Sequence, residues 1–571
     1  MTDKLTAFRQ AGAPLPATNH LWPLFGAGLD NLGVENRPIE TSLPTFGPDE
    51  LLVRHDATGL CFSDIKVIGL GEKHPRIYRN MRENPITLGH EIAMTVVGVG
   101  EHLRDQYKVG DRFTIQADIN VGGVGYAYGY EIQGGLSEYN VIDQRILDGD
   151  DGNYLLRVQP TTGYAESALT EPWACVTAAY ELKYRTGLRP GGVTWIIGSH
   201  ADPGQEYTLS AGFDANSHPR ALLLTDVPAD LEAWLRTGAK TLGVEVMAAP
   251  DVANPPLDKI DDIVLLGATS ELIETVSPRL ADFGIVALVA DQPLARPVSV
   301  DIGRVHYNRW VYTGGRSPDI ARAYSDTPVR SSLKPGGRAW FVGAGGPMGR
   351  MHVQRAIQKP NGPGIIVCSD VSTLRLGDLQ DSYAAEAAEK GIEFICLNPM
   401  EKESYAAGMA PFKAAGFDDI IVLAPIPPVI ADAGKWLADK GVMNVFAGVA
   451  RGTMTTLDLS DAYLKDARVI GHSASSIEDL RQMLHDTETG ELSPNRSVAA
   501  IGSLNAAKEG LKAVQDTTFP GKVVIWPQIK DFPLTALPDL KDSLPTVYAK
   551  LKDGKEWTIA AEEEFLRIML P

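Results

Sequence analysis

The spacing of apolar residues divides the chain into regions of different periodicity. From Glu50 to about Asn140, short apolar runs such as Leu51–Val53 and Met94–Val97 alternate with glycines and polar residues. Short strands separated by turn residues predict an all-β, barrel-like unit here. The stretch from Thr170 to Tyr184 has helical spacing, and we expect the Glu171-Pro172 pair at the start of that helix, where proline is tolerated.

The two ends of the chain show other patterns. The first 45 residues are rich in Pro, Gly and Asn, have little periodicity and predict an irregular arm. Glu556 to Leu570 is predicted to be an amphipathic helix that serves packing or assembly.

The middle of the chain contains an internal repeat. Leu188–Gly198 reads LRPGGVTWIIG, and Leu333–Gly343 reads LKPGGRAWFVG. Further matches keep one offset of 157 residues: Asp261–Leu265 with Asp418–Val422, Gly284–Val286 with Gly441–Met443, Asp301 with Asp458, and Gly314 with Gly471. In each copy apolar strands alternate with helical stretches, which is typical of a parallel sheet with crossover helices. We interpret the repeat as two dinucleotide-fold domains in tandem that arose by duplication; the alternative is two unrelated α/β units with similar opening turns.

Composition narrows the class of protein. The 571 residues predict two to four domains, and 53 basic against 72 acidic side chains give a net charge of −19. This charge argues against a nucleic-acid partner, which would need a basic face. No apolar run reaches the length of a membrane helix, the four cysteines are widely spaced, and the first residues lack a signal-peptide layout. We therefore expect a cytoplasmic enzyme without a membrane partner.

Metal-ligand side chains follow the predicted strands. Cys61 offers a thiolate, His90 an imidazole, and Glu91 and Glu171 offer carboxylates. These are the ligand types of an open zinc site. Cys175, one helical turn beyond Glu171, ranks below both glutamates, because a buried small apolar side chain explains it as well.

Several motifs around these residues resemble one enzyme family. They are Gly59–Asp64, Pro85–Leu88, Gly89–Glu91, Val109–Arg112, Gly134–Tyr139, Glu171-Pro172, Val469–Gly471 and Gly521–Ile525. Together they resemble the zinc-dependent medium-chain alcohol and polyol dehydrogenases over about two thirds of the chain. The resemblance implies an α/β fold class with a GroES-like, β-barrel-like catalytic domain and two tandem Rossmann-like, doubly wound parallel-sheet domains. The family usually has one such nucleotide domain.

The resemblance also implies roles for single residues. The hydroxyl of Ser63 would relay the proton of the substrate alcohol, and Asp64 would hold a metal-bound histidine. In the polyol branch a glutamate supplies the third anchor, and Glu91 and Glu171 match the two candidates. Many members carry a second, structural zinc on four close cysteines, but Thr114 to Gly134 contains no cysteine, so one catalytic zinc is expected.

A glycine-rich loop in the second repeat predicts the dinucleotide site. It follows an apolar strand and comprises Gly343, Gly345, Gly346, Pro347, Met348 and Gly349. Such glycines allow a pyrophosphate to approach a helix N-terminus. The next strand ends at Asp370, whose carboxylate would accept hydrogen bonds from the ribose and repel a 2′-phosphate. NAD is therefore favoured, although Arg375 nearby leaves NADP open.

The corresponding loop of the first repeat is altered. It runs from Gly198 to Gly204, lacks the middle glycine and places Asp202 where a pyrophosphate would lie. Like charges there are costly, so we expect this copy to have lost cofactor binding, although its strand ends at Asp226. In family dimers two nucleotide domains often join edge to edge, and a tandem copy can supply that partner within one chain.

These inferences predict a domain plan. We expect an irregular arm over residues 1–45, a GroES-like zinc catalytic domain over 46–187 and a degenerate Rossmann-like repeat over 188–332. An NAD-binding Rossmann domain is expected over 333–470, and a segment over 471–571 is expected to return to the catalytic domain with an extra tail.

The predicted function is a zinc-dependent NAD(P) oxidoreductase that acts on a secondary alcohol, a polyol or a sugar derivative. One alternative is a redox-neutral lyase or epimerase that oxidises its substrate transiently with tightly held NAD. A second is a non-catalytic nucleotide sensor, against which the set of Cys61, His90 and Ser63 argues. A homo-oligomer is left open.

Overall fold

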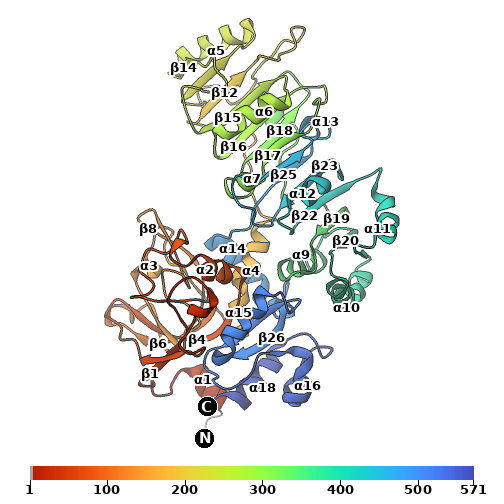
Figure 1. Cartoon of the computed structure of the whole chain (residues 1–571). Helices are drawn as coiled ribbons and strands as arrows, with labels where there is room; N and C mark the ends of the chain where they lie inside the picture. The colour runs from red at the N-terminus through yellow and green to blue at the C-terminus, as the bar shows by residue number, and fades with distance from the viewer. Residues whose placement is uncertain (1–3) are drawn as a thin grey trace. The chain divides into compact units, whose positions relative to one another are not determined.

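A computed structural model describes residues 4–571, and these form two compact units (Figure 1). The first unit contains the residues up to Thr177, Gly346–Met351 and Ser475–Pro571. The second contains Ala178–Gly345 and His352–Ala474. Within the described residues no helix is both long and apolar enough to cross a membrane.

The first unit is built on an eight-stranded sheet in the order β11-β7-β6-β4-β27-β26-β28, with β10 also paired to β4. These strands are β4 (Leu51–Gly59), β6 (Glu91–Val99), β7 (Arg112–Ile115), β10 (Tyr139–Ile142), β11 (Leu155–Arg157), β26 (Val498–Ser503), β27 (Lys522–Trp526) and β28 (Thr535–Ala536). Strand β27 pairs with β4, with Val524 opposite Gly59, so a C-terminal strand lies beside the N-terminal ones. The β-rich region predicted after Glu50 is present, with one helix, α2 (Phe62–Leu70), directly after β4.

The first 45 residues are more regular than expected. They contain α1 (Lys4–Gln10) and an antiparallel pair of β1 (Thr18–Leu21) and β3 (Ile39–Ser42). Distant residues hold this segment: the Arg54 guanidinium lies 3.5 Å from the centre of the Phe8 ring and donates to its carbonyl at 2.9 Å. The composition of the first 45 residues alone does not indicate such distant partners.

Helix α4 (Tyr164–Ala178) corrects the helix boundary predicted from sequence. It begins at Tyr164 rather than Thr170, so Pro172 lies inside it and not in its first turn. The cause is a distant cap: the backbone N–H groups of Tyr164 and Ala165 donate to Glu562 at 2.7 and 3.0 Å. Glu562 belongs to α18 (Ile559–Met569), the helix expected near the end of the chain.

The cap makes the stability of the first unit depend on pH. Burial raises the pKa of Glu562 from 4.5 to about 7, although the two N–H donors oppose the shift. The folded state therefore keeps a proton that the unfolded state releases, and stability falls as the pH rises from about 4.5 to 7. Glu562→Gln cannot titrate, so relative to the native protein it should gain about 3 kcal/mol across this window.

Hydrogen exchange at the first amides of α4, followed between pH 5 and 8, measures this difference. Glu563→Gln is the matched control, because Glu563 is partly exposed and pairs with Arg9 at 2.8 Å. Equal pH profiles for the native protein and Glu562→Gln would show that the buried carboxyl does not titrate in this range.

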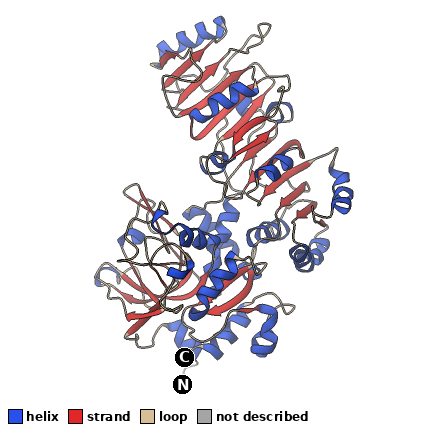
Figure 2. Ribbon diagram, viewed as in Figure 1, coloured by secondary structure: helices blue, strands red, loops and turns tan. Residues whose placement is uncertain are grey.

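The second unit contains two six-stranded parallel sheets (Figure 2). The first has the order β14-β13-β12-β15-β16-β18, from β12 (Val193–Ile197), β13 (Ala221–Thr225), β14 (Glu245–Ala248), β15 (Ile260–Leu266), β16 (Leu280–Val289) and β18 (Val311–Gly315). The second has the order β21-β20-β19-β22-β23-β25, from β19 (Arg338–Val342), β20 (Ile365–Ser369), β21 (Glu393–Leu397), β22 (Phe417–Val422), β23 (Leu437–Val445) and β25 (Arg468–Ile470). Both follow the 3-2-1-4-5-6 strand order of the Rossmann fold. The predicted fold class is thus confirmed.

The two repeats also share a buried polar network. In the first, Asp262 accepts from the Arg185 side chain at 2.7 Å and from the Arg189 backbone at 2.8 Å. In the second, Asp419 accepts from the Arg330 side chain and from the Lys334 backbone. A network that recurs at matching positions is hard to explain by two unrelated units, and it supports duplication.

The first repeat departs from the expected alternation at one point. Residues 198–220, between β12 and β13, contain no helix, whereas α9 (Pro347–Gln358) occupies this position in the second repeat. Turns replace the helix: the carboxylate of Asp202 accepts from the Gly204 N–H, and that of Asp214 accepts from the Asn216 N–H. The prediction of strands alternating with helices is wrong for this segment.

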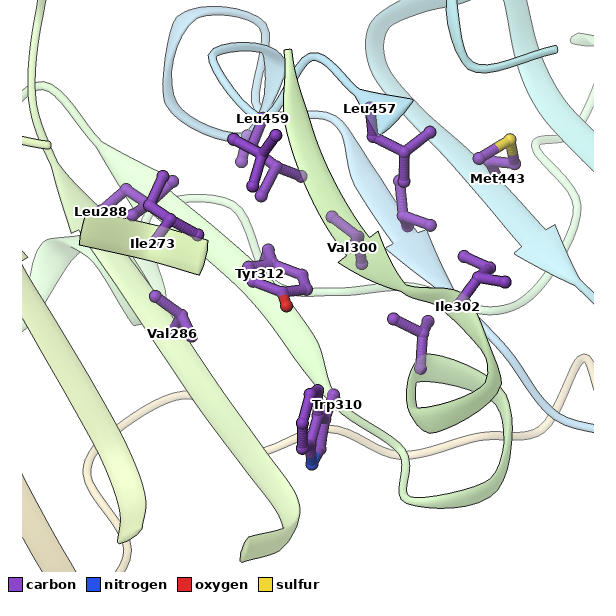
Figure 3. Close-up of a cluster of buried hydrophobic side chains, with 14 of the residues drawn as sticks. Ile273, Val286, Leu288, Val300, Ile302, Trp310, Tyr312, Met443, Leu457 and Leu459 are labelled. Atoms are coloured by element: carbon purple, nitrogen blue, oxygen red, sulfur yellow. The ribbon is translucent and has the colours of Figure 1, made fainter. Parts of the chain in front are cut away.

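The repeats join along a pair of equivalent strands. Strand β17 (Val298–Asp301) of the first repeat pairs antiparallel with β24 (Met454–Leu457) of the second, in the register Val298–Leu457 and Val300–Thr455. Under the offset of 157 residues each of these pairs maps onto the other, as in the twofold interface of a homodimer. Buried side chains of both repeats, among them Val300, Tyr312 and Leu457, form one cluster there (Figure 3). The first repeat therefore supplies a partner within the chain.

Candidate functional site

Three side chains of different chemistry meet where one strand ends and its antiparallel partner begins. Cys61 follows β4 and is the N-cap of α2, while Glu91 begins β6 directly after His90. Because β4 and β6 pair with Gly59 opposite Glu91, the two strand ends are held together. One ligand atom from each of Cys61, His90 and Glu91 lies within 4.8 Å of the others. A thiolate, an imidazole and a carboxylate at such separations fit a zinc ion.

Asp64 connects two parts of this cluster. One of its carboxylate oxygens accepts the Cys61 N–H at 3.0 Å, and the other lies 3.2 Å from His90 Nδ1. Nδ1 is thereby engaged, which leaves Nε2 of His90 for a metal. Burial lowers the pKa of His90, but Asp64, Tyr130 and Cys61 together outweigh it, and the pKa lies well above its usual value.

Lys522 is a member of the site that sequence reasoning missed. Its ammonium group is buried and donates to Glu91 Oε1. Burial lowers its pKa, but Glu91 and Cys61 raise it to about 12, so it carries a charge. The other oxygen, Glu91 Oε2, is buried and has no hydrogen-bond partner among residues 4–571. An unsatisfied carboxylate oxygen beside a thiolate and an imidazole is what an absent cation would leave.

The remaining sequence candidates lie around the cluster. Glu171 is not among the three clustered residues, but it is close enough that Glu91 and His90 influence it; burial, the largest effect, raises its pKa to about 7. Cys175 is also outside the cluster, and its Sγ donates to Ser475 Oγ at 3.7 Å. Ser63 lies partly buried in the first turn of α2. The geometry thus favours Glu91 over Glu171 as the third ligand.

A small apolar cavity of about 140 Å³ opens beside Cys61. Leu60, Phe62 and Lys522 contribute to its wall. Pro347 and Met348, which belong to the same compact unit, line it as well. Two residues predicted from the glycine loop therefore lie at the cavity that borders the cluster.

The glycine loop of the second repeat is fixed by the predicted acidic residue. Gly343 follows β19 with a φ of 81°, and the Gly345 N–H donates to Asp370 at 3.0 Å. A Cβ atom at Gly345 would lie 2.6 Å from the Arg375 Cβ and 2.9 Å from an Asp370 oxygen, so this position requires glycine. The second oxygen of Asp370 accepts the Ser372 N–H at 2.9 Å. Asp370 thus shapes the loop, and each oxygen keeps a lone pair for another donor.

The end of the loop leads directly into a helix. Around Gly346 there is open space for a Cβ atom. Pro347 is the first residue of α9, and Gly349 is buried within that helix. A glycine loop that enters a helix N-terminus is the arrangement that binds a pyrophosphate.

The first repeat lacks this arrangement. Asp226, after β13, has a φ of 47° and accepts a hydrogen bond from Ser199 at 2.9 Å. Because residues 198–220 contain no helix, this loop does not lead directly into a helix N-terminus as the loop of the second repeat does.

Comparison with known proteins places these features in a family. Residues 47–147 match the model of the alcohol dehydrogenase GroES-like domain. The chain is 24% identical over 504 residues to mannitol-1-phosphate 5-dehydrogenase of Aliivibrio fischeri, covering 87% of this chain and 84% of that protein. It is 26% identical over 315 residues to L-sorbose 1-phosphate reductase of Klebsiella pneumoniae, covering 51% of this chain and 76% of that protein.

A solved structure shares the fold. The crystal structure of 2R,3R-butanediol dehydrogenase from Bacillus subtilis superposes with a TM-score of 0.51 at 15% identity, covering 89% of this chain and 99% of that one. The GroES-like match, the relatives and the Rossmann-type sheets agree with one another. Together they support membership of the medium-chain dehydrogenase/reductase superfamily, as an atypical member with a duplicated Rossmann-like repeat.

Proposed function

We propose that the protein is a zinc-dependent oxidoreductase that transfers a hydride between NAD and a secondary alcohol of a polyol or of its phosphate ester. The observation that carries this proposal is the cluster of Cys61, His90 and Glu91 within 4.8 Å. Two of the relatives are named for phosphorylated sugars or polyols, and this supports an open-chain substrate of that class.

The residues fit a catalytic metal. Cys61, His90 and Glu91 would hold a zinc ion, and three protein ligands leave a position for the substrate oxygen. A zinc ion held there would supply the Lewis acidity that lowers the pKa of an alcohol. Asp64 keeps the His90 ring in place through Nδ1. Ser63, in the first turn of α2, would pass the hydroxyl proton toward solvent, and the cavity wall of Leu60 and Phe62 would keep water from the reacting carbon.

The residues of the second repeat fit a nicotinamide dinucleotide. Gly343, Gly345 and the N-terminus of α9 would hold the pyrophosphate, and Asp370 would accept from a ribose hydroxyl. Bound there, NAD would supply the acceptor for the hydride of the alcohol carbon. Asp370 favours NAD over NADP in this proposal, because its carboxylate repels a 2′-phosphate.

Gly345→Ala should weaken NAD binding. The added Cβ would press on the Arg375 Cβ and on the Asp370 carboxylate, so the loop has to open. We expect the Kd for NAD to rise about tenfold or more, measured by quenching of tryptophan fluorescence.

Two control variants accompany the Gly345→Ala measurement. Gly377→Ala is the control, since its Cβ would meet open space in α10 (Thr373–Glu389). Asp226→Ala in the first repeat should leave the Kd unchanged. If instead Asp226→Ala weakens NAD binding and Gly345→Ala does not, the cofactor lies in the first repeat.

The proposed reaction is tested by offering polyols and their phosphate esters with NAD and with NADP. Absorbance of the reduced nicotinamide should rise only with a secondary alcohol present, and it should rise faster with NAD. A chain that consumes no substrate in any combination would favour the nucleotide-sensor alternative.

The proposal includes a cytoplasmic location, in keeping with four free cysteines.

A further inference from the structure

The segment after α2 carries a local excess of positive charge in an acidic chain. Residues 66–82 contain five cationic side chains and one carboxylate, against a net charge of −19 for the whole chain. The cations are Lys66, Lys73, Arg76, Arg79 and Arg82. An excess of one sign that opposes the charge of the whole protein, beside a candidate active site, suggests an anionic ligand.

Part of this segment is held against the candidate metal site by an aromatic ring. The Tyr130 ring lies edge-on to His90, with centroids 5.8 Å apart, and edge-on to His74, with centroids 5.1 Å apart. Tyr130 therefore packs against both a predicted metal ligand and a residue of the basic segment. Lys66 lies one helical turn, about 5 Å, beyond Ser63 on the same face of α2.

His74 is prepared to donate a hydrogen bond. Its Nδ1 accepts the Arg76 N–H at 3.3 Å, so the ring hydrogen of the neutral form is on Nε2. Burial lowers the pKa of His74, and the positive charges of Arg76 and Lys66 lower it further. The Arg76 backbone thus contacts the imidazole directly, and the charge of Lys66 acts on it as well. Lys66 itself is exposed.

The segment that contains His74 and Arg76 is held in place by contacts within the protein, before any ligand binds. The Arg76 guanidinium pairs with Asp118, and the Tyr78 N–H donates to Glu131 at 2.9 Å. Arg79 also pairs with Glu131, at 3.1 Å. Because Asp118 offsets the charge of Arg76, Lys66 supplies the uncompensated charge and His74 a directed donor. Little ordering is left for a ligand to induce.

We propose that Lys66 and His74, with Arg76 behind them, form a subsite for the phosphate group of a phosphorylated polyol whose oxidised carbon lies at the Cys61 cluster. The inference rests on the proposed function and names its substrate class more closely. A phosphate monoester carries up to two charges and accepts several hydrogen bonds, which an ammonium group and an imidazole N–H can meet. An unphosphorylated polyol of the same length would leave these groups unmatched.

The test compares a phosphorylated polyol with its unphosphorylated parent. The ratio of their kcat/KM values should exceed one in the native protein and fall about 10- to 100-fold in Lys66→Met, as expected for the loss of a charged hydrogen bond. Lys73→Met is the matched control: Lys73 is exposed on the same segment, and the ratio should not change. His74→Phe keeps a ring against Tyr130 and should lower the ratio as well. An unchanged ratio in Lys66→Met would overturn the subsite.

Two further measurements are needed. One distinguishes a substrate phosphate from a cofactor phosphate, and the other distinguishes failure of the subsite from failure of the proposed function. If Lys66→Met alters the preference between NAD and NADP instead, the group binds the cofactor phosphate and the subsite is wrong. Isothermal titration with inorganic phosphate, at saturating NAD, does not require turnover. It should show binding that weakens about tenfold in Lys66→Met and not in Lys73→Met. Such binding without turnover of either polyol would contradict the proposed function alone, and equal binding by all three proteins would contradict the subsite alone.

Discussion

Cys61→Ser should abolish tight zinc binding and turnover together. A serine hydroxyl is a poor ligand compared with a thiolate, and Cys61 is the only sulfur among the three clustered residues. We expect the zinc affinity to fall by more than the 10- to 100-fold that is typical of losing an outer hydrogen-bond partner of a metal ligand. Elemental analysis after dialysis should find one zinc per chain in the native protein and almost none in the variant.

The chain offers a matched control for this change. Cys175 is a second cysteine of the same unit that lies outside the cluster. Cys175→Ser should keep one zinc per chain and most of the activity. Loss of zinc in Cys175→Ser but not in Cys61→Ser would move the metal toward Glu171, and two tight zinc ions per chain would contradict the single site.

Lys522→Met should strongly destabilise the metal-free first unit. The change removes the ammonium group that pairs with Glu91 and leaves a buried carboxylate without a partner. Breaking a buried pair in this way costs about 3–5 kcal/mol. Hydrogen exchange at the β27 amides reports this local loss without requiring the whole chain to unfold in one step.

Zinc separates this explanation from a simple packing defect. A cation at Glu91 would replace the lost positive charge, so saturating zinc should restore much of the protection in Lys522→Met. Lys530→Met, at an exposed position four residues beyond β27, should change nothing. A loss of protection that zinc does not relieve would mean that Lys522 matters for packing rather than for the charge of Glu91.

The metal cluster could be predicted because its members lie close together in sequence and carry distinctive chemistry. Cys61, His90 and Glu91 are zinc-ligand types set in motifs that resemble a known family, and the pairing of β4 with β6 in the structure brings them together. Lys522 could not be assigned in the same way, since 431 residues separate it from Glu91. The one available signal was a lysine at the start of the apolar strand Lys522–Trp526, where a charged group needs a partner.

The two errors have different causes. The start of α4 depends on Glu562, which lies 398 residues from Tyr164, and a prediction from local signals therefore placed the boundary at the proline. The absent helix of the first repeat did leave local signs, because Pro203, Gly204 and Gly212 interrupt residues 198–220. The repeated strand pattern nevertheless led to the prediction of a helix between these strands. A repeated strand pattern predicts the sheet well and the connections poorly, because the core constrains only the sheet.

The central claim is net oxidation and reduction at the Cys61 cluster, and the reduced cofactor tests it most directly. With the zinc-loaded chain, NAD and a phosphorylated polyol, absorbance of NADH and the amount of ketone formed should rise together in steady state, one molecule of NADH for each ketone. Conversion of the polyol into an eliminated or epimerised product without accumulation of NADH would contradict the claim and establish the redox-neutral reaction in its place.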